Sequence, residues 1–126
     1  MSVDRVRQYF ADKGLNYPIM EFEVSTATVE LAAAALGVEP ARIAKTMAIR
    51  LKDKVIVVVA KGDARLDNRK FKDCFKQKAR MLSPEEVLEV IGYPVGGVCP
   101  FGLEKIPVYL AVSLQQFDCV YPAAGS

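Results

Sequence analysis

Histidine and tryptophan are absent from this 126-residue chain, and cysteine is scarce. Without histidine the chain cannot build a Ser-His-Asp or Cys-His catalytic pair, or a metal site with an imidazole ligand. The three cysteines, Cys74, Cys99 and Cys119, are odd in number, lie far apart and form no Cys-x-x-Cys pair. We therefore expect no disulfide framework and no metal site, and the cysteine usage favours a reducing cytoplasmic compartment.

Long apolar runs are missing as well. No run reaches the roughly 18 residues of a membrane span, and the N-terminal residues lack the apolar core of a secretory signal. The composition, 52% hydrophobic and 25% charged, is that of an ordinary globular protein without repeats. The length predicts a single domain over residues 1–126, and the lack of a long apolar run predicts no membrane partner.

Neither basic nor acidic residues dominate the chain, because the net charge is only +2. It is unevenly distributed: the segment 61–80 has eight basic and three acidic residues, a net +5, whereas the rest of the chain carries a net −3. Such a segment is what the phosphates of a nucleic acid would select. A solvated helix face is the common alternative for a charge run.

The hydrophobic periodicity predicts alternating helices and strands in the order α-β-α-β-β-α-α-β-β. Helices are expected at 2–14, from Thr26 or Thr28 to 36, from 67 onward and at 83–92, and strands at 17–24, 45–51, 55–59, 108–112 and 119–121. A short helical turn is expected at 40–43. This order predicts an α+β fold with a mixed, mostly antiparallel sheet flanked by helices.

Local signals place several of these boundaries. Lys52-Asp53-Lys54 forms a polar hairpin turn, and the unbroken β-branched run after it suits a central strand. Asp67 caps a helix that should turn Phe71, Cys74 and Phe75 inward. The sequence Ser83-Pro84-Glu85-Glu86 is a capping box with proline at the first helical position.

The segment 92–102 is unusually rich in glycine and proline, with four of the eight glycines and two of the seven prolines. Glycine lets the backbone approach a ligand closely, and proline stiffens the path between glycines. Such a loop can present backbone amides to an ester or carboxylate oxygen. The alternative is a simple connection between a helix and a strand. The loop is neither a Walker loop nor a GxGxxG fingerprint, so it implies no nucleotide cofactor.

Two motifs together resemble a known family. Lys45-Thr46 opens a strand, and Gly96-Gly97-Val98-Cys99-Pro100-Phe101-Gly102 follows later, with Gly96 to Pro100 matching a GxxxP element. This combination resembles the YbaK/prolyl-tRNA-synthetase-associated domain family of aminoacyl-tRNA editing deacylases. The Leu36-Gly37-Val38 turn and the closing Ala124-Gly125-Ser126 are similar as well, so the resemblance covers nearly the whole chain.

The resemblance implies a YbaK-like α+β pseudobarrel that hydrolyses the ester of a mischarged aminoacyl-tRNA, with no cofactor. The implied partners are aminoacyl-tRNA and an aminoacyl-tRNA synthetase, and not DNA. In this family the lysine is thought to hold the terminal adenosine or the ester carbonyl, while the GxxxP backbone shapes the pocket. The implied catalytic residues are Lys45, Gly96 and Gly97, the implied substrate-binding residues are Phe22, Thr46, Val98, Cys99, Pro100, Gly125 and Ser126, and the residues expected to bind tRNA are Arg69, Lys70, Lys72 and Lys76.

Simpler interpretations stay open for several of these residues. Lys45 also suits a strand end with its ammonium in water. Cys99 suits a buried packing position better than a nucleophile, since no histidine can activate it. Phe22 and Met20 fit a core as well as a pocket, and for Met20 we favour the core. At the level of function, the alternatives to an enzyme are a binding module for aminoacyl-tRNA or its 3′ end, and an interaction domain.

The chain departs from the family pattern at its C-terminal end. The family usually continues into a further strand and helix, so the resemblance implies site residues beyond Ser126 that this sequence does not contain. The family also often has a polar residue before the last glycine, where this chain has Ala123 and Ala124. This departure argues against chemistry specific to cysteinyl-tRNA.

Overall fold

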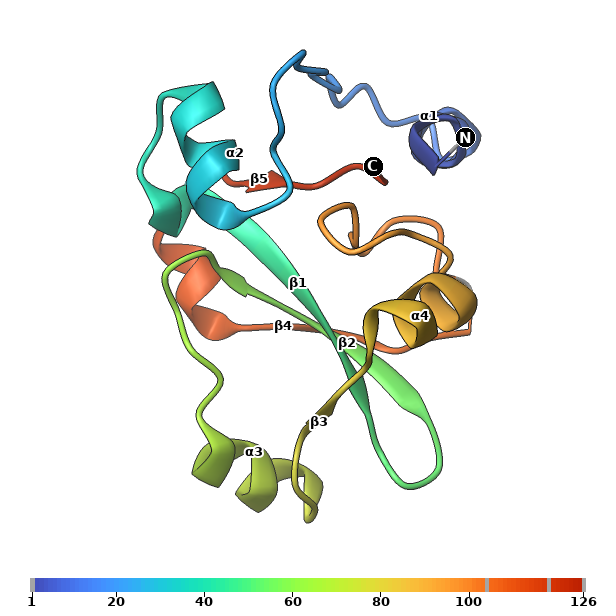
Figure 1. Cartoon of the computed structure of the whole chain (residues 1–126), viewed down its shortest axis with the longest axis vertical. Helices are drawn as coiled ribbons and strands as arrows, with labels where there is room; N and C mark the ends of the chain where they lie inside the picture. Colours follow the sequence, from blue (N-terminus) through green and yellow to red (C-terminus); the bar gives the residue numbers. More distant parts are fainter. Residues whose placement is uncertain (1, 104, 118, 126) are drawn as a thin grey trace.

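A computed structural model describes residues 2–103, 105–117 and 119–125. The chain alternates helices and strands, and Figure 1 shows them around a single sheet. The elements are α1 (Ser2–Asp12), α2 (Val29–Leu36), the 3-10 turn η1 (Pro40–Arg42), β1 (Ile43–Arg50), β2 (Val55–Lys61), α3 (Asn68–Phe75), β3 (Arg80–Met81), α4 (Pro84–Glu86), the π-helical turn η2 (Val87–Ile91), β4 (Val108–Leu110), the 3-10 turn η3 (Val112–Gln116) and β5 (Tyr121–Pro122).

The sheet is open and mixed, in the order β3-β1-β2-β4. The long β1–β2 hairpin is antiparallel, with Ala44 opposite Lys61 and Arg50 opposite Val55. β3 pairs antiparallel to one end of β1, whereas β5 pairs parallel to its other end and β4 pairs parallel to β2. The predicted α+β class and the mixed, mostly antiparallel sheet are confirmed.

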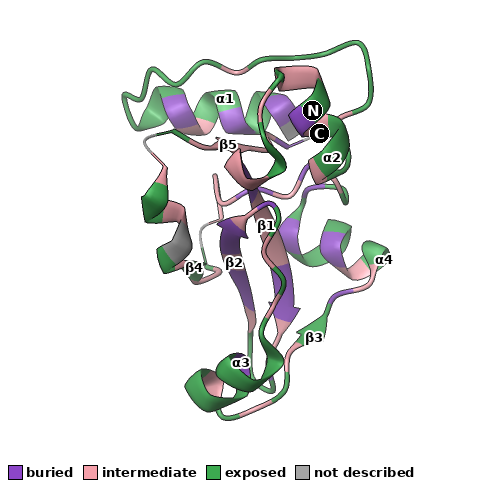
Figure 2. Cartoon of the chain, turned by 90° about the vertical axis from the view of Figure 1, so that its left-hand side faces the viewer, coloured by how far each residue is buried: buried purple, intermediate pink, exposed green. Residues whose placement is uncertain are grey.

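The two faces of the β1–β2 hairpin pack against two different hydrophobic clusters. Alternation along the strands sends Ala44, Ala48, Val57 and Val59 into the main core, which α1 and η2 complete. The opposite face holds a smaller cluster around Ile49, Leu51 and Ile56, which Phe71 of α3 covers. In Figure 2 the buried positions follow β1 and β2 through the centre, while α1 and α3 lie at opposite ends.

Side-chain caps fix three helix starts at the expected positions. The Asp67 carboxylate accepts a hydrogen bond from the Lys70 backbone N–H at 3.0 Å, and Thr28 caps α2 in the same way. The capping box closes reciprocally: the Glu86 N–H donates to the Ser83 hydroxyl at 3.2 Å, and the Ser83 N–H donates to Glu86 at 3.1 Å. Each cap satisfies N–H groups that the first helical turn leaves free.

The predicted strand at 17–24 is wrong, because this segment forms neither helix nor strand. The outer edge of β1 is occupied by β3 and β5, and that of β2 by β4. Pro18 cannot donate to a ladder in any case. Tyr17, Met20 and Val24 are exposed, so the core interpretation of Met20 is wrong as well.

Three smaller predictions also need correction. Cys74 is exposed rather than turned into the core, since Phe71 and the half-buried Phe75 supply the inward face of α3. The helix after Ser83 continues as a π-helical turn. The last strand begins at Tyr121, two residues later than expected, and leaves Cys119 exposed. No helix in the described part of the chain is long and apolar enough to span a membrane.

Candidate functional site

The glycine-rich loop 92–102 packs against the segment that leads into α2. Gly96 has a φ of 93°, in the left-handed region that favours glycine. A Cβ at Gly96 would lie 3.0 Å from both Cα and Cβ of Ala27. The close approach of these two segments therefore requires glycine at position 96.

The next residue links the loop to the C-terminal segment. The Gly97 N–H donates to the Pro94 carbonyl at 2.9 Å and closes a turn, while the Gly97 carbonyl accepts from the Gly125 N–H at 3.0 Å. Since β5 pairs with the start of β1, this segment joins the loop to the strand that begins with Ile43. The structure thus brings Gly96, Gly97 and Gly125 together, and Ser126 lies outside the described residues.

Two partly exposed backbone amides of this loop have no internal partner. The N–H groups of Gly96 and Val98 have no hydrogen-bond acceptor among the residues that the structure describes. Backbone amides in a braced loop are the kind of donor that can stabilise an oxyanion.

Cys99 lies beneath the loop, fully buried in the main core. Burial raises the pKa of the Cys99 thiol above its usual range, so the thiolate is disfavoured. Tyr93 is equally buried and donates from its hydroxyl to the Phe101 carbonyl at 2.6 Å. Burial, together with Cys99, raises the pKa of Tyr93 to about 12. These two residues pack the loop, while Val98 and Pro100 are half-buried beside them.

Lys45 and Thr46 are the third and fourth residues of β1, which begins two residues earlier than expected, and they point to opposite faces of the sheet. Thr46 shares the face of Ala44 and Ala48, which pack in the core that contains Cys99. Its hydroxyl oxygen is buried and has no hydrogen-bond partner among the described residues. The Lys45 ammonium instead donates to the Ala64 carbonyl, in the segment after β2. The loop and Thr46 therefore share one face, whereas the Lys45 ammonium is turned away from them.

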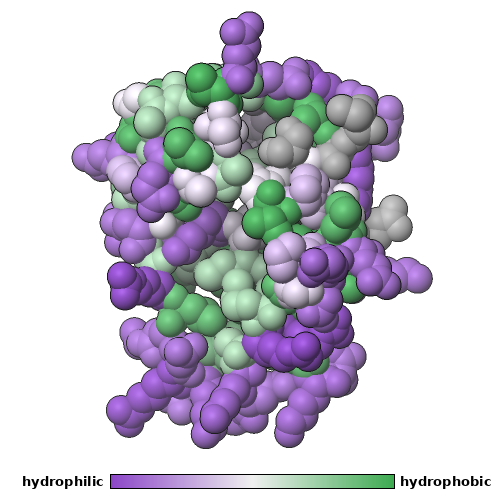
Figure 3. All heavy atoms as spheres, viewed as in Figure 1, coloured by the Kyte–Doolittle hydropathy of each residue, from purple (hydrophilic) through white to green (hydrophobic). Residues whose placement is uncertain are grey.

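Phe22 and the residues predicted to bind tRNA are more exposed than residues 96–100 of the loop. Phe22 is 40% exposed in the irregular segment before α2. Arg69, Lys70 and Lys72 are exposed on α3, and Lys76 ends this helix with a φ of 60°. Hydrophilic residues cover this end of the molecule in Figure 3, far from the loop in Figure 1. The basic surface and the loop are thus separate parts of the molecule.

Two hollows of the described surface lie near these residues. One is lined by Arg5 and by residues of η2 and of the segment 102–106, and another lies between α3 and β4. No group of three or more Cys, Asp or Glu side chains in the described ranges is arranged to hold a metal ion. The contacts of Arg5 and Ala27 with the loop were not predicted, because they join residues far apart in the sequence.

Comparison with known proteins tests the family resemblance. Residues 23–126 match the family described as the aminoacyl-tRNA editing domain. The chain belongs to this family. The resemblance seen in Lys45-Thr46 and in the loop is thereby confirmed, and the function of this chain lies in aminoacyl-tRNA editing.

Relatives of the editing domain include whole proteins and parts of larger ones. The uncharacterized protein YwhH of Bacillus subtilis (strain 168) is 52% identical over 128 residues, covering 100% of this chain and 82% of YwhH. A proline–tRNA ligase of Thermotoga maritima is 36% identical over 93 residues, which cover 71% of this chain but only 16% of the ligase.

Solved structures agree with this assignment. The hypothetical protein APE2540 is similar with a TM-score of 0.89 and 33% identity, over 97% of this chain and 83% of its own. A proposed trans-editing enzyme for prolyl-tRNA synthetase is similar with a TM-score of 0.87 and 29% identity, over 99% of this chain and 81% of its own. The fold of the editing domain is therefore shared along nearly all of this chain.

Proposed function

We propose that this chain is a trans-editing aminoacyl-tRNA deacylase, which hydrolyses the ester between a wrong amino acid and the terminal ribose of a tRNA. The observation that carries the proposal is the loop at Gly96–Pro100, in which the unpaired amides of Gly96 and Val98 are held in place by the contacts of the loop with Ala27 and Gly125. These donors suit the oxyanion that forms when water attacks the ester carbonyl carbon.

The proposed reaction needs no histidine. Water adds to the carbonyl carbon and the carbon–oxygen bond to the ribose breaks. One proton of the water passes to the ribose oxygen, the other is released to solvent, and the amino acid leaves as a carboxylate. The loop amides stabilise the tetrahedral oxyanion. The buried Thr46 hydroxyl, which has no partner in the described chain, holds a polar atom of the aminoacyl group.

Lys45 has a different place in this proposal. Its ammonium exchanges the Ala64 carbonyl for an oxygen of the terminal adenosine or of the ester, through rotation of its own side chain. A long, flexible side chain permits this exchange without a backbone shift. Phe22, Val98, Pro100 and Gly125 border the aminoacyl pocket, and Cys99 supports it by packing.

The tRNA itself is bound at a distance from the ester. Arg69, Lys70, Lys72 and Lys76 offer an exposed basic surface on α3, and phosphate contacts supply much of the affinity of proteins for nucleic acids. The matching segment of a proline–tRNA ligase makes tRNAPro the first substrate to examine, and prolyl-tRNA synthetase the first protein partner.

A non-catalytic binding module is the second candidate. The Lys45 ammonium, bonded to a protein carbonyl rather than turned toward the loop, favours it. A panel of mischarged tRNAs, including tRNAPro charged with amino acids other than proline, separates the two. Hydrolysis supports the deacylase, protection of the ester without hydrolysis supports the binding module, and no effect on any tRNA contradicts both.

A further inference from the structure

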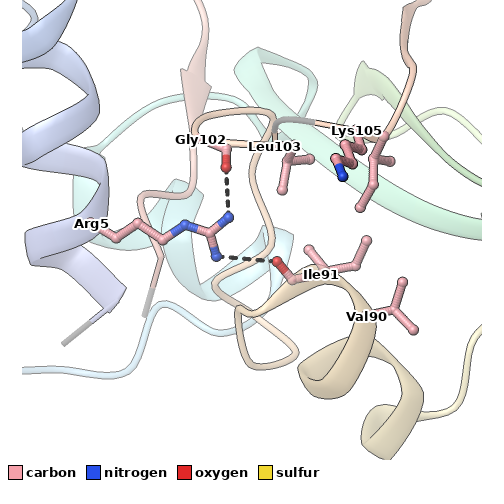
Figure 4. A pocket seen from close by; sticks show the side chains of 7 residues that line it. Arg5, Val90, Ile91, Gly102, Leu103 and Lys105 are labelled. Atoms are coloured by element: carbon pink, nitrogen blue, oxygen red, sulfur yellow. Dashed lines mark hydrogen bonds between the residues drawn. The ribbon is translucent and has the colours of Figure 1, made fainter.

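The side chain of Arg5, from α1, closes the glycine-rich loop at both of its ends. One guanidinium nitrogen donates to the Ile91 carbonyl, just before the loop, at 3.3 Å. Another donates to the Gly102 carbonyl, at the far end of the loop, at 2.6 Å. Figure 4 shows this fork reaching from α1 to both carbonyls. One rigid, planar group thus fixes the separation of two points that are eleven residues apart in the chain.

A second contact holds the Arg5 guanidinium against the ring of Tyr93. The Arg5 guanidinium carbon lies 4.6 Å from the centre of the buried Tyr93 ring, in a cation–π arrangement. The Tyr93 hydroxyl in turn donates to the Phe101 carbonyl at 2.6 Å. Arg5 and Tyr93 therefore form a stacked pair, and each member ties the start of the loop to its end.

The flanking glycines leave room for this arrangement. A Cβ at Gly92 would lie 2.5 Å from a guanidinium nitrogen of Arg5. A Cβ at Gly102 would lie 3.2 Å from the Tyr93 hydroxyl and 3.4 Å from Nε of Arg5. Part of the glycine content of the loop is therefore explained by the space that Arg5 occupies.

We propose that Arg5 is a positioning residue for the editing reaction, which sets the geometry of the Gly96–Pro100 loop through its two ends. Arg5 precedes residues 23–126, the part of the chain that matches the family, so α1 adds a site component that the match does not cover. This proposal rests on the proposed deacylase function. Displacement of a catalytic group by about 1 Å can lower turnover about 100-fold, so a loosened loop is expected to affect kcat.

The test compares Arg5→Met and Arg5→Lys with Arg7→Met in the full chain. Arg7 lies on the same helix and forms an exposed ion pair with Glu21 at 2.9 Å, so its variant removes an equal charge without touching the loop. We expect Arg5→Met to lower kcat on a mischarged tRNA about 10- to 100-fold, with KM changed less than about threefold. Arg7→Met should leave both constants unchanged. Arg5→Lys should not restore kcat, because an ammonium cannot span both carbonyls.

Hydrogen exchange provides the readout that does not depend on catalysis. Arg5→Met should speed exchange of the loop amides, including that of Gly97, and leave those of the β1–β2 hairpin unchanged. An unchanged kcat, a raised KM with constant kcat, or full rescue by Arg5→Lys would each overturn the proposal. An inactive wild-type protein would instead overturn the proposed function, and the exchange rates alone would then decide whether Arg5 holds the loop.

Discussion

At the scale of single residues, Lys45 and Thr46 near the start of β1 point to opposite faces of the sheet. Alternation sends Thr46 toward the loop and Lys45 toward the Ala64 segment, so neighbouring side chains face two different surfaces. One substrate can engage both only if it reaches the end of the strand, where β5 and the C-terminal segment also lie. We infer that the aminoacyl ester lies across this strand end.

Lys45→Ala should lower kcat/KM for deacylation at least about 100-fold, the usual cost of losing a well-placed oxyanion stabiliser. The free energy of unfolding should fall by only about 1 kcal/mol, since a single hydrogen bond to the Ala64 carbonyl is lost. Steady-state kinetics and urea unfolding measure both quantities. Lys54→Ala, an exposed lysine of the hairpin turn, is the control. Full activity in Lys45→Ala would remove this residue from the mechanism.

At the scale of elements, turnover should depend on the backbone of the loop at Gly96 rather than on the thiol of Cys99. Gly96→Ala places a methyl group against Ala27 at a φ of 93°, so turnover should fall, and fall more for a bulky aminoacyl ester than for a small one. Gly14→Ala is the control, because its φ of 66° gives comparable strain with no atom within 4 Å.

Cys99→Ser should largely retain activity, with a loss of stability, since its thiol is buried and un-ionised. A silent Gly96→Ala combined with an inactive Cys99→Ser would point to covalent thiol catalysis.

Substitutions on α3 should change the affinity for tRNA and not the rate of ester hydrolysis. Lys70→Glu with Lys76→Glu should weaken tRNA binding and reduce the slope of affinity against salt concentration, because fewer phosphates are neutralised. Hydrolysis of a minimal aminoacyl ester without the tRNA stem should hardly change. Lys13→Glu, at an exposed lysine after α1, is the control, because it reverses a charge away from α3. Unaltered affinity and salt slope would show that this face is ordinary solvated surface.

The elements that the sequence predicted well are those whose signals are local. The β1–β2 hairpin and the caps at Asp67 and Ser83 depend on residues a few positions apart, and they occur where expected. The segment 17–24 has a strand-like pattern, but both edges of the β1–β2 hairpin are taken by β3, β4 and β5, which lie far away in the sequence. The loop motif was likewise visible, whereas its contacts with Arg5 and Ala27 were not.

At the scale of the whole molecule, burial of Tyr93 and Cys99 should make the fold sensitive to alkali. The fold favours the protonated forms, so the unfolded chain loses its protons first, above the ordinary values of 9.0 for cysteine and 10.0 for tyrosine. The free energy of unfolding should therefore be insensitive to these groups below about pH 9 and fall as the pH rises toward 12. Urea unfolding of Tyr93→Phe should show a shallower fall between pH 10 and 12. A curve parallel to that of the wild type would contradict this account.

The central claim is that the chain itself transfers an aminoacyl group from tRNA to water. Single-turnover release of the amino acid from a mischarged tRNA, carried out in water labelled with oxygen-18, tests this claim most directly. We predict release above the protein-free rate, with one labelled oxygen in the amino acid carboxylate and none in the ribose of the tRNA, and a rate at least about 100-fold lower for Lys45→Ala. Release no faster than without protein, for every mischarged tRNA of the panel, would contradict the claim.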